Sequence, residues 1–185
     1  MIYRFLLLSD EADNFMREIE IDSEASFLDL HHIILKSAGY TADQMSSFFI
    51  CDDEWNRKTE ITLVDMDTSS EEDAYVMEST QLEELLEDED QKLLYVFDYM
   101  TERAFFMELR EIIPGKRLKQ PVCSRSEGVP PPQTVSFEEA EAKMVASDSL
   151  GENFYGDSDF DIDELDSEGF DGLDNLQNPF DEERY

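Results

Sequence analysis

Positive charge is scarce in this sequence. Lys and Arg number 14 against 47 Asp and Glu, which gives a formal net charge of -33 at pH 7. Because a surface of this sign repels phosphate backbones and anionic lipid, direct binding to nucleic acid or to a membrane surface is disfavoured. The natural complement of such a surface is a basic protein surface, and we expect partners of that kind.

Cysteine and glycine are also scarce, and this excludes several kinds of site. Cys51 and Cys123 are the only cysteines, and their positions fit free thiols in a reducing compartment better than a disulfide framework. Seven glycines leave little material for a phosphate-binding loop, and no Ser-His-Asp, Cys-His or HExxH pattern is present. We therefore expect no catalytic, cofactor-binding or metal-binding residues.

Long hydrophobic runs are missing as well. The first apolar run, Ile2 to Leu8, is interrupted by Arg4 and followed directly by polar residues. It is too short for the hydrophobic region of a signal peptide and far too short for a membrane span. We expect a cytoplasmic protein.

Residues 1–115 have the periodicities of a folded α+β domain. Ile2–Leu8 is apolar on both alternating faces, which predicts a central strand. Phe15–Ile21 alternates between apolar and polar residues, which predicts a hairpin with the first strand. Ser26–Gly39 combines a capping box, apolar residues at helical spacing and a terminal glycine, which together predict a helix.

Further elements are predicted along the same domain. Ser47–Cys51 and Ile61–Val64 indicate short strands, and a capping box at Thr80–Glu83 indicates a short helix. Leu93–Tyr99 and Phe105–Ile113 indicate the last hairpin. The order of these elements predicts an α+β fold with a mostly antiparallel sheet packed against two or three helices, followed by an acidic C-terminal tail.

The C-terminal third differs in composition. Residues 116–135 collect proline, glycine and basic residues, which indicates a linker, and a cap at Ser136 predicts a short helix over 136–147. Residues 148–185 hold fourteen Asp or Glu and one basic residue. So charged a segment cannot bury enough apolar surface to form a core, and we expect a disordered tail.

The tail is the part of the sequence most open to a binding function. Its acidic residues alternate with apolar ones, as in disordered segments that fold onto a partner. The acidic residues would steer the tail toward a basic surface, and the apolar side chains would fill a groove on that surface. The candidate partner-binding residues are Phe154, Tyr155, Phe160, Leu165, Phe170 and Leu173. The tail could instead fold back over basic residues near Lys116–Lys119 as a lid or a dimer clasp.

Asp98 is an unusual residue for its position. It lies on a predicted strand that is otherwise apolar on both faces, and an unpaired buried carboxylate is costly. Arg17 and Arg103 are the candidate partners. The structural interpretation is an ion pair that fixes strand register. The functional interpretation is a polar pocket in which Asp98 acts as acid or base, with Tyr95 or Tyr99 nearby.

Two other patterns resemble metal-binding sites, but neither is expected to bind a metal ion specifically. His31 lies on the apolar stripe of the first helix and His32 points about 100° away, so the pair is poorly placed to chelate one metal ion. We expect a core or capping role for His31. The acidic series Asp157–Glu168 matches the liganding positions of a calcium loop, but Ile162 stands where the turn needs glycine. Specific calcium binding is therefore not expected.

Three short sequence motifs resemble those of a known family. Phe15–Ile21 matches an aromatic-Arg-apolar strand, Ser26–His31 matches Thr-Phe-x-x-Leu-His, and Tyr95–Tyr99 matches Tyr-x-Tyr-Asp-Phe. In these three motifs the chain resembles the Ri-plasmid ORF-three-like family, whose members also occur as passenger proteins of transposable elements. The resemblance covers most of residues 1–115 and implies an α+β fold. The family continues with Gly-Asp-x-Trp-x-His where this chain has Met100–Phe105, so the resemblance implies no function.

Three hypotheses about function follow. The leading one is a non-enzymatic protein-interaction module whose acidic tail engages a basic protein surface, with a mobile-element context suggested by the family resemblance. The second is an enzyme of unknown reaction with a pocket around Asp98 and Arg103. The third is a DNA mimic that inhibits a nucleic-acid-binding protein.

Overall fold

An eight-stranded sheet forms the centre of the fold in the computed structural model, which describes residues 1–65 and 75–136. Its order is β5-β4-β3-β6-β7-β1-β2-β8, and every neighbouring pair is antiparallel except β4 with β5. The strands are β1 Ile2–Leu8, β2 Met16–Asp22, β3 Ser47–Cys51, β4 Arg57–Thr62, β5 Tyr75–Val76, β6 Lys92–Asp98, β7 Arg103–Ile113 and β8 Val122–Glu127. The predicted α+β fold with a mostly antiparallel sheet is confirmed.

Strand β1 lies inside the sheet, as its apolar character on both faces predicts. It pairs with β2 on one side and with β7 on the other. Both predicted hairpins, β1 with β2 and β6 with β7, form in the structure. Strand β4 begins at Arg57, four residues before the predicted start at Ile61.

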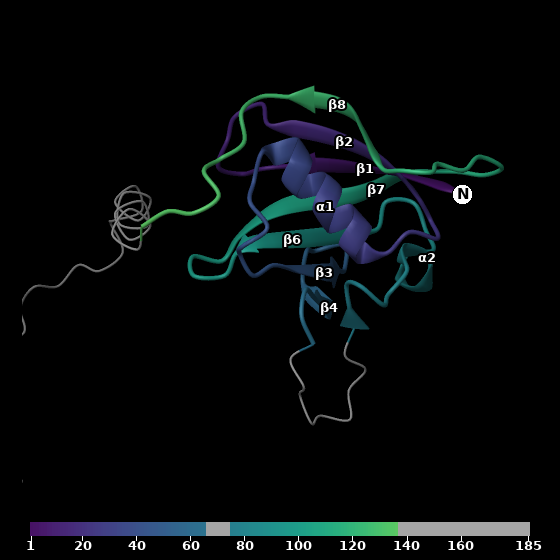
Figure 1. Cartoon of the computed structure of the whole chain (residues 1–185), viewed down its shortest axis with the longest axis horizontal. Helices are drawn as coiled ribbons and strands as arrows, with labels where there is room; N and C mark the ends of the chain where they lie inside the picture. The colour runs from purple at the N-terminus through teal and green to yellow at the C-terminus, as the bar shows by residue number, and fades with distance from the viewer. Residues whose placement is uncertain (66–74, 137–185) are drawn as a thin grey trace, which may run out of the picture. The chain divides into compact units, whose positions relative to one another are not determined.

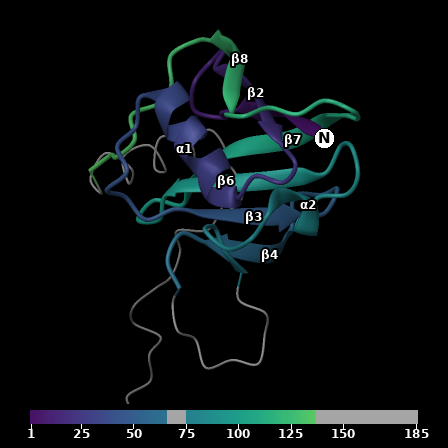
Figure 2. The ribbon, with the colours of Figure 1, turned by 45° about the vertical axis from the view of Figure 1, so that its right-hand side comes forward.

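Helix α1, Phe27–Ala38, lies across one face of the sheet (Figures 1 and 2). The Ser26 side chain accepts a hydrogen bond from the Asp29 backbone, and the Asp29 carboxylate accepts one from the Ser26 backbone, so the predicted capping box forms. Gly39 ends the helix with φ of 69°, a left-handed conformation that costs glycine little.

Helix α2, Leu82–Leu85, begins one residue later than predicted. Its N-cap residue is Gln81, whose backbone N–H donates to the Glu84 carboxylate at 2.9 Å. The prediction of a Thr80–Glu83 cap is wrong, because Thr80 is buried and Glu83 instead accepts a hydrogen bond from the Ser23 hydroxyl.

Strand β8 corrects the prediction that residues 116–135 are a linker throughout. Val122–Glu127 pair with β2 at the edge of the sheet. Composition does not reveal this strand, because its side chains are mostly exposed and carry no apolar alternation. The predicted helix over 136–147 and the predicted tail over 148–185 fall almost wholly outside the described residues.

The hydrophobic core lies between α1 and the sheet. It joins inward side chains of the strands, such as Phe5, Ile19 and Phe105, to Phe27 and Ile34 of α1. The described residues place no helix on the opposite face, which is called the outer face below (Figure 2). Within the same residues, no helix is long and apolar enough to cross a membrane.

Candidate functional site

Asp98 and Arg103 face each other across the turn that joins β6 to β7. They are register partners, and Arg103 Nη1 lies 3.6 Å from Asp98 Oδ2 with each side chain 8% exposed. Asp98 Oδ1 also accepts the backbone N–H of Met100 at 3.0 Å, and Oδ2 accepts the hydroxyl of Thr101 at 2.7 Å. Both carboxylate oxygens of Asp98 are therefore engaged in closing this turn.

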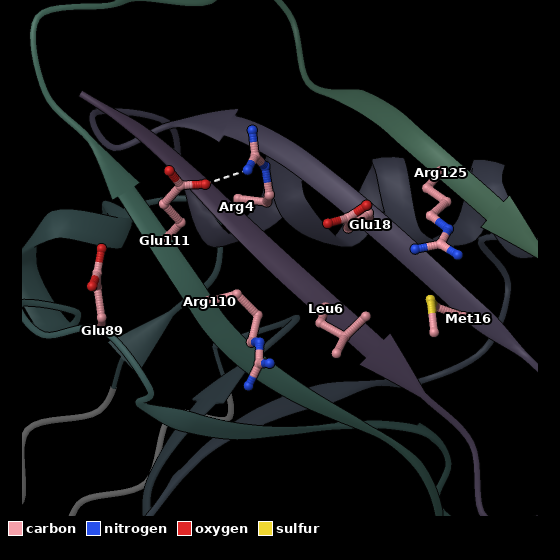
Figure 3. A pocket seen from close by; sticks show the side chains of 8 residues that line it. All are labelled: Arg4, Leu6, Met16, Glu18, Glu89, Arg110, Glu111 and Arg125. Atoms are coloured by element: carbon pink, nitrogen blue, oxygen red, sulfur yellow. Dashed lines mark hydrogen bonds and ion pairs between the residues drawn. The ribbon is translucent and has the colours of Figure 1, made fainter.

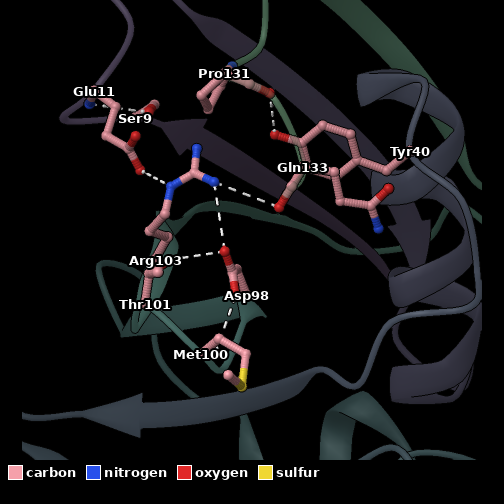
Figure 4. A network of polar contacts seen from close by, with 9 residues as sticks. All are labelled: Ser9, Glu11, Tyr40, Asp98, Met100, Thr101, Arg103, Pro131 and Gln133. Carbon is pink, nitrogen blue, oxygen red and sulfur yellow. Dashed lines mark hydrogen bonds and ion pairs between the residues drawn. The ribbon is translucent and has the colours of Figure 1, made fainter. Parts of the chain in front are cut away.

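Arg103 joins the turn to two other parts of the chain (Figure 4). Its Nε donates to the Glu11 carboxylate at 2.6 Å, and its Nη1 donates to the Gln133 carbonyl at 3.4 Å. The guanidinium also lies 5.1 Å from the centre of the Phe97 ring. Its Nη2 is buried and has no hydrogen-bond partner among the described residues. This arginine thus links β7, the β1–β2 turn and the segment after β8.

Arg17, the other predicted partner of Asp98, lies elsewhere. It is 4% exposed and donates to four backbone carbonyls, those of Met16, Ser37, Glu127 and Gly128. Ser37 is in the last turn of α1, where the helix dipole places negative charge. Arg17 therefore joins the end of α1 to the end of β8, and the structure does not bring it to Asp98.

The two tyrosines considered for a pocket with Asp98 also point elsewhere. Tyr95 Oη lies 2.8 Å from His31 Nδ1, and Ser46 Oγ contacts the same nitrogen at 3.3 Å. Tyr99 donates to Glu60 at 2.8 Å and contacts the Ser47 hydroxyl. Burial raises the pKa of the Tyr95 phenol well above its usual value and raises that of Tyr99 to about 12. Both phenols are therefore neutral at physiological pH.

His31 is a core residue, as predicted. Its side chain lies between α1 and β6 and is 2% exposed. Burial, and then the neighbouring His32, lower the pKa of His31 to about 4. The imidazole is neutral at pH 7, two hydroxyls lie within hydrogen-bond distance of its Nδ1, and the side chain is almost fully shielded from solvent.

A polar hollow on the outer face was not predicted from the sequence. It has a volume of about 490 Å³ and lies on the side of the sheet away from α1 (Figure 3). Three arginines, three glutamates, a leucine and a methionine line it: Arg4, Arg110, Arg125, Glu18, Glu89, Glu111, Leu6 and Met16. The sequence holds one indication of this hollow. Arg4 interrupts an apolar strand and so marks a polar position on the face opposite the core.

The arginines of the hollow are paired with carboxylates. Arg4 contacts Glu111 and lies 3.0 Å from Glu20. Arg110 pairs with Glu108 at 2.9 Å, and Arg125 pairs with Glu127 at 2.7 Å. These side chains are partly exposed, so each pair contributes little stability. Counting these partners, six glutamates accompany the three arginines, so the hollow and its rim carry a net negative charge.

No metal centre is found in the part of the chain that the structure describes, where no three His, Cys, Asp or Glu side chains gather closely enough to bind an ion. Cys51 and Cys123 are both free thiols. The predicted tail residues from Phe154 to Leu173, and the acidic series Asp157–Glu168, lie outside the described residues.

Comparisons with known proteins agree with this fold. A family model described as plasmid pRiA4b ORF-3-like protein matches residues 3–168. The crystal structure of the protein of unknown function MM3350 from Methanosarcina mazei Go1 is similar, with a TM-score of 0.60 and 17% identity, over 82% of this chain and 83% of that one. At that identity the likeness concerns the fold alone. No curated protein matches the chain.

Proposed function

The chain belongs to the plasmid pRiA4b ORF-3-like family, and we propose that it is a non-enzymatic protein-interaction module whose acidic tail engages a basic protein surface. The plasmid named in the family's description supports adding an association with mobile elements to the proposal. The observation that carries the proposal is the composition of residues 148–185, where fourteen acidic residues and one basic residue are interleaved with aromatic and aliphatic ones.

The geometry of the folded domain supports this function over an enzyme with a pocket around Asp98 and Arg103. Both oxygens of Asp98 are occupied by groups of its own turn. His31, the buried histidine of the core, faces Tyr95 and Ser46 rather than an opening. A general acid or base must lie within hydrogen-bond reach of its substrate, and these groups are engaged internally.

Two forces would act together in the proposed complex. Long-range attraction between the acidic tail and a basic surface would accelerate encounter and weaken as salt is added. Burial of the six aromatic and leucine side chains would supply specificity that charge alone does not give. A DNA mimic is the more specific version of this function, in which the partner's basic surface is one that binds nucleic acid.

The test is affinity capture from cells that naturally produce the protein. The bait is the full chain, and the matched control is a chain in which the six apolar tail residues are serine. These substitutions leave the net charge at -33, so they separate groove filling from charge. The changes are Phe154→Ser, Tyr155→Ser, Phe160→Ser, Leu165→Ser, Phe170→Ser and Leu173→Ser.

We expect a basic protein that binds the full chain at least ten times more tightly than the control in a binary titration, with an affinity that falls as salt rises. Equal affinity for both chains would mean that charge alone is recognised and would contradict the proposal. Displacement of nucleic acid from the captured protein would identify the DNA-mimic version.

A further inference from the structure

The segment that follows β8 is rich in proline and uncharged. Residues 128–136 contain three consecutive prolines and no charged side chain, in a chain of which 33% is charged. Pro131 is buried, whereas Val129 is 79% exposed. No hydrogen bond between backbone groups holds residues 129–133 to the rest of the described chain. Residues 128–133 are called the strap below, because side chains of other elements fasten them beside the end of α1.

Three side chains donate hydrogen bonds to backbone carbonyls of the strap (Figure 4). They come from β2, from the residues just after α1 and from β7. The pairs are Arg17 with Gly128 at 3.3 Å, Tyr40 with Pro131 at 2.7 Å and Arg103 with Gln133 at 3.4 Å. A proline-rich chain makes no internal hydrogen bonds, so its carbonyls accept donors from elsewhere. These three contacts therefore depend on the backbone of the strap and not on its side chains.

Aromatic rings lie next to these donors. The Tyr40 ring stacks on Phe105 at 5.8 Å and lies 5.3 Å from Phe97. The Arg17 guanidinium lies 4.4 Å from the centre of the Phe15 ring. Proteins that bind proline-rich peptides do so with surfaces lined by aromatic residues, against which the stiff peptide loses little conformational entropy. The folded domain offers this combination of rings and carbonyl donors where the strap lies.

The strap does not satisfy every donor of this site. Arg103 is 8% exposed, and its Nη2 is buried without a hydrogen-bond partner among the described residues. A buried donor without an acceptor opposes closure of the strap, because opening would return that donor to water. The one specific side-chain contact of the strap is that of Gln133, which exchanges two hydrogen bonds of 2.8 Å with the Thr41 backbone. The site therefore has a donor left for an acceptor that another peptide brings.

We propose that Arg17, Tyr40 and Arg103, with the aromatic rings beside them, form a binding site for an extended proline-rich segment of another protein. The strap is the chain's own occupant of this site, and the partner's segment replaces it. The site is separate from the acidic tail, so this proposal goes beyond the function proposed above.

The charges around the site favour an uncharged proline-rich segment over other occupants. Arg103 already pairs with Glu11 and Asp98, so its positive charge is compensated within the chain. An acidic peptide would meet these two carboxylates, and a second copy of the chain would bring its own net charge of -33. A neutral segment with free carbonyls matches the donors without either repulsion, as the strap itself does.

Calorimetric titration with a synthetic peptide tests the proposal. The probe is residues 128–136 of this sequence, acetylated and amidated at its ends. The receptor is the full chain with Pro131→Gly and Gln133→Ala, which weaken its own strap and leave all three donors in place. We expect this chain to bind the peptide at least ten times more tightly than the wild type, in which the tethered strap competes at high effective concentration.

Two controls locate the binding. Adding Tyr40→Phe to the altered chain keeps the ring and removes the donor to the carbonyl, so the affinity should fall about fivefold. A peptide with alanine in place of its three prolines should bind at least ten times more weakly. Circular dichroism verifies that each chain is folded. No saturable binding to the altered chain, equal affinity for the altered and wild-type chains, or an affinity that Tyr40→Phe does not change would overturn the proposal.

A second measurement uses the wild-type chain and so does not depend on the folding of a variant. With the peptide in millimolar excess, NMR relaxation of the Val129 and Thr134 amides should show fast motion as the strap leaves the site. Amides that stay rigid would overturn the proposal. A wild-type dimer in sedimentation velocity that the peptide dissociates would make a second copy the occupant, and this would also overturn it.

Discussion

His31 illustrates how the fold decides the chemistry of a single residue. A histidine on the apolar stripe of a helix becomes neutral when it is buried, because burial disfavours the charged form. The hydroxyls of Tyr95 and Ser46 both lie within hydrogen-bond distance of Nδ1 of the neutral imidazole. The residue therefore stabilises the fold at neutral pH and opposes it in acid.

Acid should destabilise the protein partly through His31. Its pKa is about 4 in the folded state against 6.5 when unperturbed, so between these values the unfolded chain binds more protons. The contribution of His31 to the free energy of unfolding is fully present above pH 6.5. It falls by on the order of 3 kcal/mol as the pH drops toward 4. Urea unfolding at several pH values should show a steeper loss over this window in the wild type than in His31→Gln. Parallel curves for the two proteins would contradict the assignment.

The sequence predicted some polar residues well and others only in part. Asp98 and Arg103 are close in the chain and on one hairpin, so their pairing could be anticipated. The carbonyl partners of Arg17 come from α1 and from the end of β8, about 20 and 110 residues away. Spacing along the chain gives no information on such contacts. The left-handed backbone of Trp55 also depends on a turn geometry that composition does not reveal.

At the scale of elements, strand β8 depends on a few specific contacts. Its side chains are mostly exposed, so the pairing with β2 and the bonds from Arg17 to Glu127 and Gly128 hold it in place. Gly128 has φ of 65° and packs closely on the β1–β2 turn. A side chain at Gly128 would therefore push β8 and the segment after it away from the sheet.

Two glycine substitutions separate this packing from backbone strain. In Gly128→Ala the new Cβ would lie 2.4 Å from the Asn14 carbonyl oxygen, whereas in Gly115→Ala it would meet nothing within 4 Å. Both glycines have positive φ, so both variants lose about 1 kcal/mol from backbone conformation. We expect the free energy of unfolding, measured in urea, to fall by roughly 2 kcal/mol more in Gly128→Ala than in Gly115→Ala. Equal losses would mean that the segment after β8 is not packed on this turn.

Elements with a strong apolar signature were predicted, and those without one were missed. Strands β1, β2, β6 and β7 and helix α1 bury an apolar face, so their periodicity is visible in the sequence. Helix α2 was found but displaced by one residue, because Thr80 and Gln81 are both followed three residues later by glutamate. Strand β8 was missed because it buries almost nothing.

At the scale of the whole molecule, the negative charge opposes the compact state. Like charges are closer together in the folded chain than in the unfolded one, and salt screens their repulsion. The family and the fold class could be inferred from the sequence. The strand order could not, because nothing in the local pattern says which hairpin lies beside which.

Thermal stability should therefore rise with salt. Between 0.05 and 0.5 M NaCl the distance over which charges interact falls from about 14 to about 4 Å. We expect an increase in Tm on the order of 5 °C, measured by calorimetry. Neutral sucrose at matched osmolality is the control that separates screening from general solute effects. A Tm that is constant or falls with NaCl would show that self-repulsion does not limit stability.

Site-specific photo-crosslinking in cells that naturally produce the protein would test the proposed function most directly. A photoreactive phenylalanine analogue replaces Phe160 or Phe170 of the tail, or Val64 or Val129 of the folded domain, which are 52% and 79% exposed. We predict that both tail positions crosslink to one basic protein and that neither domain position does. The absence of such a product from the tail, or equal yields from all four positions, would contradict it.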